Sequence, residues 1–346
     1  MAAYTTIDNP ELYFQTKLYT GNFTDNTAIT LDGSEDMQPD LVWLKERAEA
    51  EGHRLHDSAR GATKYIQTSS ANAEATNADT LKSFNSDGFT LGANNEHNQS
   101  SMTYVAWCWK AGTTSGITTN GDTDVTPSAY SFNQTSGFSI VKWSSAAGQT
   151  AHGLGKKPQF IFTKRTDSAG SWKTYHEVLD ATDFIKINDT AATEDNDTVW
   201  GDTEPDTVNF TVGSAFGSSD DYVGYCFTSI QGYSKFGSYT GNVNADGVFI
   251  YLGFKPALFI VKETGNAEPW VMYDNKRGDY GNANPNDQHL VANGTATESS
   301  GTAIDFLSNG VKLRSNAGHL NEGNYIYMAW AEAPFVNSNG VPGNAR

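Results

Sequence analysis

The apolar residues of this chain fall into short runs of strand length, and three of these runs share one spacing. In each, a proline opens a stretch of mainly aliphatic, β-branched and aromatic residues, and a lysine closes it. The three segments are Pro39–Lys45, Pro158–Lys164 and Pro256–Lys262. Runs of this length and composition are typical of β-strands.

The same three copies continue on both sides of these runs. Downstream comes a shorter strand pattern at 88–92, 209–213 and 310–314, and then an aromatic strand at 104–109, 222–227 and 327–331. Upstream, Tyr-Thr-Gly-Asn occurs at 19–22 and at 239–242, while the second copy has Val141–Trp143 near this place. The chain is therefore interpreted as three diverged copies of one module.

The loops between these patterns are rich in Asn, Asp, Gly and Ser, and helical periodicity is nearly absent. Only residues 46–51 and 72–83 suggest short helical turns. The predicted fold class is all-β, with three tandem diverged β-sandwich modules of jelly-roll or lectin-like type and very little helix.

The repeat also predicts where the modules begin and end. The expected order is an N-terminal attachment arm (1–16), β module 1 (17–112), a linker (113–130), β module 2 (131–231), β module 3 (232–336) and a C-terminal tail (337–346). The linker is rich in Gly, Thr and Asp, a composition typical of flexible segments. The pattern leaves open whether the modules are independent sandwiches or one pseudo-threefold body.

Charge and hydropathy exclude two classes of partner. The net charge is −17, from 40 acidic and 23 basic residues, and no basic patch offsets it, so we expect no nucleic-acid binding. No apolar stretch approaches the roughly 20 residues of a membrane span, so no membrane insertion is expected. The first residues have neither a basic nor an apolar region of a signal peptide.

The repeat provides an internal control, because a residue that the fold requires recurs at equivalent positions. Lys45, Lys164 and Lys262 recur, and we expect their stems to lie over aromatic rings with the ammonium groups in water. Ligand binding by these lysines is the less favoured alternative.

Cys108 and Cys226 also correspond, and the alignment places Ala331 at the same position in the third copy. These cysteines are therefore expected to be buried free thiols.

Residues with metal-binding chemistry form no complete motif. His53 and His56 have i,i+3 spacing, but neither a helix nor a glutamate completes a metal site. His176 aligns with Asp57 and Asp274, so neither a carboxylate role nor an imidazole role is retained at that position in all three copies. The acidic loops at 121–124 and 195–197 lack the calcium-loop pattern, which favours solvated loops over Ca²⁺ sites.

No catalytic signature is present either. The chain has no nucleophile elbow, phosphate-binding loop or dinucleotide fingerprint. Trp172 and Trp270 follow the recurrent lysines at equal spacing and are expected in the core, not on a sugar-binding platform. We therefore predict no enzyme activity, no catalytic, cofactor-binding or metal-binding residues, and no cofactor.

Several segments together resemble a repeat module of virion structural proteins from tailed phages that infect marine bacteria and cyanobacteria. The resemblance covers nearly the whole chain and rests on 39–45, 57–64, 84–92, 104–110, 152–155, 232–242, 274–277 and the ending 344–346. The second copy departs most, with Val178–Asp180 where the first has Ala59–Gly61.

This resemblance implies a virion surface structural protein, expected to be a tail-fibre or host-attachment component. A capsid (head) decoration protein and a virion-associated polysaccharide-degrading enzyme are the alternatives. The implied partners are other virion proteins, further copies of the chain in a homo-oligomer (a trimer is favoured) and a host-surface glycan. The implied location is the virion surface, after synthesis in the host cytoplasm. The resemblance assigns no catalytic or cofactor residue.

Overall fold

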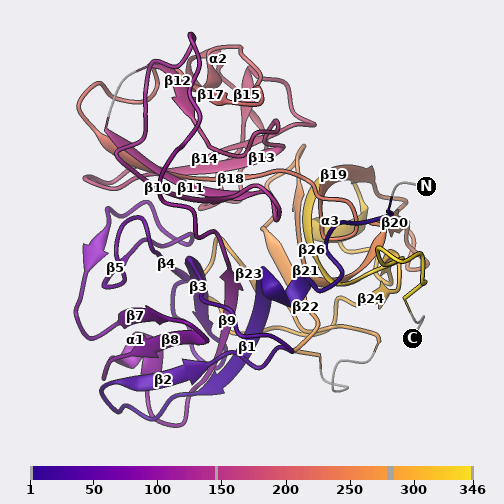
Figure 1. The fold of residues 1–346 in the computed structure, drawn as a ribbon. Coiled ribbons are helices and arrows are strands. Elements are labelled where there is room, and N and C mark those ends of the chain that lie inside the picture. The colour runs from indigo at the N-terminus through magenta and orange to yellow at the C-terminus, as the bar shows by residue number, and fades with distance from the viewer. Residues whose placement is uncertain (1–2, 145–146, 279–283, 344–346) are drawn as a thin grey trace.

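The computed structural model describes residues 3–144, 147–278 and 284–343. Within these ranges the chain consists almost entirely of strands paired in antiparallel sheets, which confirms the all-β prediction. Figure 1 shows three lobes around a common centre, and each lobe is one module. No helix in the described residues is long and apolar enough to cross a membrane.

Module 1 is a sandwich of two sheets, ordered β1-β9-β3-β4 and β2-β8-β7, with a separate short pair β5-β6. Its elements are η1 (Pro10–Leu12), β1 (Phe14–Thr20), β2 (Thr27–Thr30), β3 (Leu41–Glu46), β4 (Arg54–Asp57), β5 (Lys64–Tyr65), β6 (Ala75–Thr76), β7 (Leu81–Asn85), β8 (Gly88–Leu91), α1 (Asn95–Asn98) and β9 (Thr103–Trp109). Apolar side chains from both sheets fill the space between them.

Module 2 repeats this plan with one additional strand at the edge of its larger sheet and one strand fewer in its smaller sheet. The sheets are ordered β10-β11-β18-β13-β14, β12-β17 and β15-β16. The elements are β10 (Ala129–Asn133), β11 (Phe138–Ser144), β12 (Gly148–Ala151), β13 (Phe160–Arg165), β14 (Lys173–His176), β15 (Asp183–Phe184), β16 (Glu194–Asp195), α2 (Asp197–Trp200), β17 (Asn209–Val212) and β18 (Asp221–Phe227). By register, β11 and β18 correspond to β1 and β9 of module 1.

Module 3 pairs a five-stranded sheet, β19-β26-β21-β22-β23, with a three-stranded sheet, β20-β25-β24. Its elements are β19 (Ser234–Thr240), β20 (Phe249–Tyr251), β21 (Phe254–Glu263), β22 (Val271–Asp274), β23 (Leu290–Val291), β24 (Ile304–Leu307), β25 (Gly310–Leu313), α3 (Gly318–Asn321) and β26 (Asn324–Pro334). The strand β21 starts two residues before Pro256, which sits at a register shift in the ladder with β26.

The repeated strands are buried on both faces, which explains why their apolar runs are continuous and do not alternate with polar residues. In β3, Val42 and Leu44 pack into the core of module 1. Leu41 and Trp43, on the opposite face, pack into a second core at the centre of the molecule. The strands β13 and β21 divide their side chains between two cores in the same way.

The central core joins the modules into one closed ring, because all three contribute side chains to it. Equivalent backbone N–H groups also donate across each junction at 2.9 Å, namely Glu74 to Thr166 O, Thr193 to Thr264 O and Glu298 to Arg47 O. Module 1 thus contacts module 2, module 2 contacts module 3, and module 3 contacts module 1. Of the two organisations left open by the sequence, the structure has the pseudo-threefold body.

The two helical turns expected from the sequence are wrong. Residues 46–51 form the end of β3 and a bend, and residues 72–83 contain β6 and the start of β7. The second segment stays extended because Glu74 uses its backbone N–H to bind the neighbouring module. The helices of the described residues are single turns elsewhere.

The terminal segments and the expected linker lie against the body. Residues 14–16 of the expected attachment arm belong to β1, and Thr5 Oγ1 donates to Gln231 O at 2.7 Å. In the tail, Ser338 N–H donates to Asp8 Oδ1 at 2.6 Å. The expected linker, 113–130, packs over module 2, where Val125 forms a bridge with Thr150.

Candidate functional site

The three recurrent lysines are buried, which corrects the expectation of ammonium groups in water. Each Nζ donates to the backbone carbonyl of the next residue, and burial lowers the pKa of all three lysines to about 8. Lys164 also donates to Ala71 O at 3.3 Å, and Lys262 to Thr190 O at 3.2 Å, both in a neighbouring module. Carbonyl oxygens replace water as acceptors for all three, and Lys164 and Lys262 help to hold the ring together, whereas Lys45 donates within its own module.

The cysteines are buried free thiols, and burial raises the pKa of both. Their equivalent in the third copy is Ala329 and not Ala331, because Ala329 pairs with Phe259 as Cys108 pairs with Val42. The prediction that Ala331 corresponds to the two cysteines was therefore wrong by two residues. The position still holds a small apolar side chain in every module.

The Tyr-Thr-Gly-Asn motif is a packing device in modules 1 and 3. Gly21 lies so close to the chain that an added Cβ would be 2.2 Å from Gln99 O. The next residue, Asn22, donates its N–H to the buried Asn98 Oδ1 at 3.0 Å. Gly241, Asn242 and Asn321 repeat this arrangement, so the motif serves the fold.

Trp172 and Trp270 are buried at module junctions. The Trp172 indole N–H donates to Gln67 O, and that of Trp270 to Lys186 O, both at 2.9 Å. Neither ring is accessible to a ligand.

The histidines are also buried or partly buried, and among the described residues no group of three or more His, Cys, Asp or Glu side chains has a geometry suited to a metal ion. His56 Nε2 lies 2.9 Å from His97 Nε2, while its Nδ1 faces Ala62 O. Burial lowers the pKa of His56 to about 3. The acidic loops are bound within the chain or exposed, as where Asp124 Oδ2 accepts the Gln149 N–H at 2.8 Å.

The most elaborate polar chemistry lies at the junction of modules 1 and 2, here called the Asp57 seam. Asp57 Oδ2 accepts from Arg60 Nε at 2.5 Å and from Tyr225 Oη at 2.6 Å. Arg60 also donates to Leu55 O and pairs with Glu74. The Asp57 and Arg60 side chains have no exposed surface, and burial is the largest cause raising the pKa of Tyr225.

The junction of modules 3 and 1, the Asp274 seam, repeats this arrangement with different partners. Asp274 Oδ2 accepts from Arg277 Nε at 2.5 Å and from the Trp107 indole N–H at 3.0 Å. Arg277 also donates to Met272 O and pairs with Glu298 at 2.9 Å. Trp107 and Tyr225 occupy the same register position in β9 and β18.

The junction of modules 2 and 3, the His176 seam, has no charged pair at the equivalent position. His176 replaces the aspartate and its Nε2 faces Tyr327 O at 3.4 Å, while Leu179 stands where the other copies have arginine. Burial lowers the pKa of His176 to about 4, so the ring is neutral at pH 7.

These seams contain acid, base and guanidinium groups, but Asp57 and Asp274 are completely enclosed. A buried Asp–Arg pair with every partner inside the protein has no path to a substrate, and its chemistry is structural. The sequence contained a signal for it that went unused, since Asp57/Arg60 and Asp274/Arg277 share i,i+3 spacing at equivalent positions.

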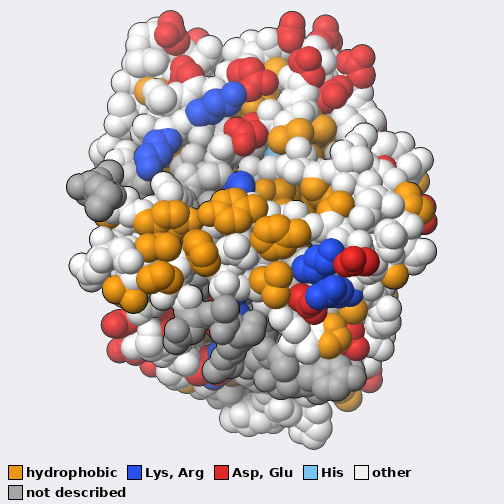
Figure 2. Space-filling view, turned by 90° about the vertical axis from the view of Figure 1, so that its right-hand side faces the viewer, with side chains coloured by type: hydrophobic (Ala, Val, Ile, Leu, Met, Phe, Trp, Pro, Cys, Tyr) orange, Lys and Arg blue, Asp and Glu red, His pale blue; other side chains and the backbone are white. Residues whose placement is uncertain are grey.

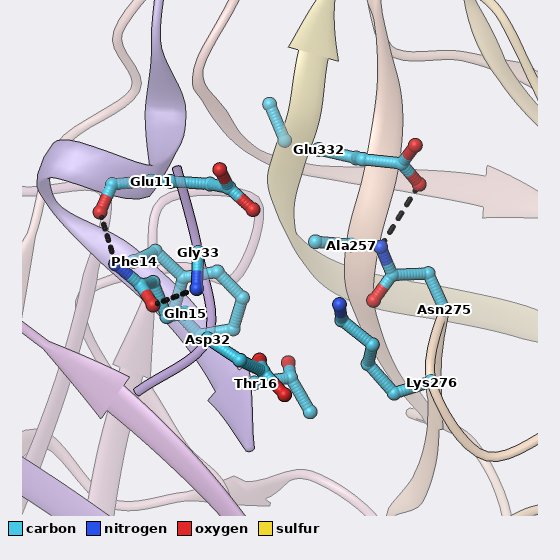
Figure 3. A pocket seen from close by; sticks show the side chains of 11 residues that line it. Glu11, Phe14, Gln15, Thr16, Asp32, Gly33, Ala257, Asn275, Lys276 and Glu332 are labelled. Carbon is cyan, nitrogen blue, oxygen red and sulfur yellow. Dashed lines mark hydrogen bonds between the residues drawn. The ribbon is translucent and has the colours of Figure 1, made fainter. Parts of the chain in front are cut away.

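A small cleft lies between modules 1 and 3, and Figure 3 shows Glu11 and Glu332 on its opposite walls. Both carboxylates are engaged: Glu11 Oε2 accepts the Ser34 N–H at 2.7 Å, and Glu332 binds Lys255 and Asn275. The cleft has room for one or two water molecules and not for an organic substrate.

The site and the fold together define a class: a closed all-β ring of three modules whose recurrent polar residues join the modules. Residues 9–334 match a family model described as a domain of unknown function (DUF7483), and the chain belongs to that family. No curated protein and no solved structure matches the chain.

Proposed function

We propose that this chain is a virion surface structural protein of a tailed phage of marine bacteria, acting as a tail-fibre or host-attachment component. The observation that supports this proposal best is that the recurrent polar residues are used to close the ring. A rigid, acidic body built in this way suits display on a particle in salt water, where exposed charges are screened over a few Å.

The proposed role is non-catalytic. The enclosed carboxylates of Asp57 and Asp274 and the small size of the cleft support this part of the proposal. Incubation with host polysaccharide is expected to release no new reducing ends. Release that is lost in Glu11→Gln or Glu332→Gln would instead favour a polysaccharide-degrading enzyme.

A head decoration protein is the second candidate, and the compact ring favours it. A fibre usually contains an elongated shaft, whereas the described residues have neither coiled-coil heptads nor long helices. The three modules already provide a threefold arrangement within one chain, so a trimer of chains is not needed to create one.

Cryo-electron microscopy of the intact virion distinguishes the two candidates. Density for this body on the tail or its fibres would support host attachment and justify glycan-binding screens. Density at regular positions on the head shell would replace that proposal with decoration. Absence of the chain from purified virions would overturn both.

A further inference from the structure

The side of module 3 formed by β19 and β20 is open, whereas the same side of module 2 is covered. In module 2, β10 pairs with β11, and residues 124–125 add to the edge of β12. The Val125 N–H donates to Gln149 O at 3.0 Å, and the Ala151 N–H donates to Val125 O at 3.1 Å. The chain itself thus shows that this edge accepts a further strand.

The corresponding edge strand in module 3 has free backbone groups. Val248 O and the Leu252 N–H form their hydrogen bonds on the side of β25. Because alternate residues of a strand direct their backbone groups to opposite sides, the N–H and C=O groups of Phe249 and Tyr251 point away from the sheet. Among the described residues, neither backbone group of Phe249 has a hydrogen-bond partner, while Tyr251 O accepts from Lys235 Nζ at 2.7 Å. An open edge of this kind is a template for strand pairing.

The side chains on this edge are aromatic and exposed, 46% for Phe249 and 49% for Tyr251. By register, the equivalent residues are Ala28 and Thr30 in module 1, and Gln149 and Ala151 in module 2. The fold therefore does not require aromatic residues at these two positions. Large apolar side chains that the fold does not require are typical of interaction surfaces.

The surface around this edge is apolar and nearly balanced in charge. Tyr4 Oη lies 3.3 Å from Tyr251 Oη, and the terminal segments meet here, since Tyr4 and Phe335 both donate to Gly253 O. Val341 of the C-terminal tail is 57% exposed. Figure 2 shows an apolar band across this side of the molecule, with acidic side chains gathered mainly above it.

Local charges matter because the whole chain carries −17. Beside the edge, Lys312 pairs with Asp246 at 2.7 Å and Arg314 pairs with Asp305 at 2.6 Å, and Lys235 adds a further cation. We call the surface around β20 the β20 patch. Two copies of an acidic protein repel each other least when they meet through a surface with nearly balanced charges, as the β20 patch has. The β20 patch also adjoins the contacts that the N-terminal arm and the C-terminal tail make with module 3.

From these observations we propose that β20 is the interface for a second copy of this chain. The two β20 strands pair antiparallel about a two-fold axis at Ile250, so that Phe249 lies opposite the partner's Tyr251. Each such pair exchanges two backbone hydrogen bonds and places two aromatic side chains next to each other. An isologous contact of this kind closes at the dimer and does not propagate into a fibre.

Sedimentation equilibrium of the full chain over a concentration series in high salt tests this proposal. We expect a reversible dimer, weakened at least about tenfold by Phe249→Ala combined with Tyr251→Thr, the residues of module 1. Phe23→Ala is the matched control, because Phe23 is 47% exposed but lies in module 1. A wild type that stays monomeric, or a dimer that the double variant leaves intact, would overturn the proposal.

A second measurement does not depend on weakening the contact. Two residues that face each other in a hydrogen-bonded antiparallel pair have their Cα atoms about 5.5 Å apart. This separation is within disulfide reach. The double variant Phe249→Cys with Tyr251→Cys is therefore expected to form disulfide-linked dimers on mild oxidation, because both native cysteines are buried. Ala28→Cys with Thr30→Cys, the equivalent pair in module 1, is expected to remain monomeric. Equal cross-linking of both pairs would overturn the proposed interface.

Discussion

The Asp57 and His176 seams occupy equivalent places in the ring but are held by different chemistry. The Asp57 seam encloses a carboxylate, a guanidinium and a phenol, whereas the His176 seam has a neutral imidazole, Leu179 and Met328. Both junctions keep the same backbone bond of 2.9 Å. The charged cluster is thus one solution to filling this position, and the ring geometry does not depend on it.

The charged seams are expected to be the most sensitive to losing one partner. Arg277→Leu leaves the enclosed Asp274 without its cation, while Glu298 keeps Arg47, and we expect the free energy of unfolding to fall by about 3–5 kcal/mol. Urea denaturation measures this change.

The matched control for that variant is Arg165→Leu, which removes a partly exposed arginine paired with Asp167 and Asp220. Little change is expected there, because surface pairs contribute little to stability. Equal losses in the two variants would show that enclosure of the pair does not determine its importance.

The phenol of the Asp57 seam is expected to have a smaller effect. Tyr225→Phe removes the donor to Asp57 Oδ2 at 2.6 Å, and we expect a loss of about 2 kcal/mol, typical of a hydrogen bond to a charged group. Thermal unfolding, with Tyr251→Phe as the exposed control, provides the comparison. An unchanged midpoint would mean that Arg60 alone satisfies the carboxylate.

The neutral seam is expected to respond to acid. Burial lowers the pKa of His176 to about 4, below its unfolded value near 6.5. The unfolded chain therefore takes up a proton first, and stability present above pH 6.5 is lost as the pH falls toward 4. His176 alone accounts for about 1–2 kcal/mol between pH 6.5 and 5. His176→Gln is expected to flatten this part of the pH profile of the unfolding free energy, and an identical profile would contradict the assignment.

The smallest effect is expected when one seam is converted completely into the other. Asp57→His, Arg60→Leu and Tyr225→Met together copy the His176 seam into the Asp57 seam. Since exchange of a buried ion cluster for apolar groups is often neutral, we expect a change of about 1 kcal/mol or less. A loss as large as that of a single arginine substitution would show that the two junctions differ in shape as well as in chemistry.

The features that the sequence predicted correctly are those that depend on the side-chain pattern within a single strand. The apolar runs of 39–45, 158–164 and 256–262 gave the strands β3, β13 and β21, and the repeat of the pattern gave three modules. Enclosure of the lysines was missed because a lysine at a strand end normally reaches water. Here the neighbouring module covers it, as where Lys164 meets Ala71 O.

The exposed aromatic pair on β20 was missed for the opposite reason. In sequence, Phe249 and Tyr251 look like any strand residues of a β protein, and strand aromatics are usually core. Only the register with β25 shows which face they occupy, and only the comparison with Ala28 and Thr30 shows that the fold does not need them.

By itself, the sequence determined the all-β class, the threefold repeat and the small apolar position of Cys108 and Cys226, because these follow from local side-chain patterns. The tertiary structure decided that the modules close into one ring, that three lysines and two Asp–Arg pairs are enclosed at or near its seams, and that the β20 edge of module 3 stays open. These properties depend on contacts between residues far apart in the chain, such as Trp107 with Asp274. A strand pattern specifies which faces are apolar but not what covers them.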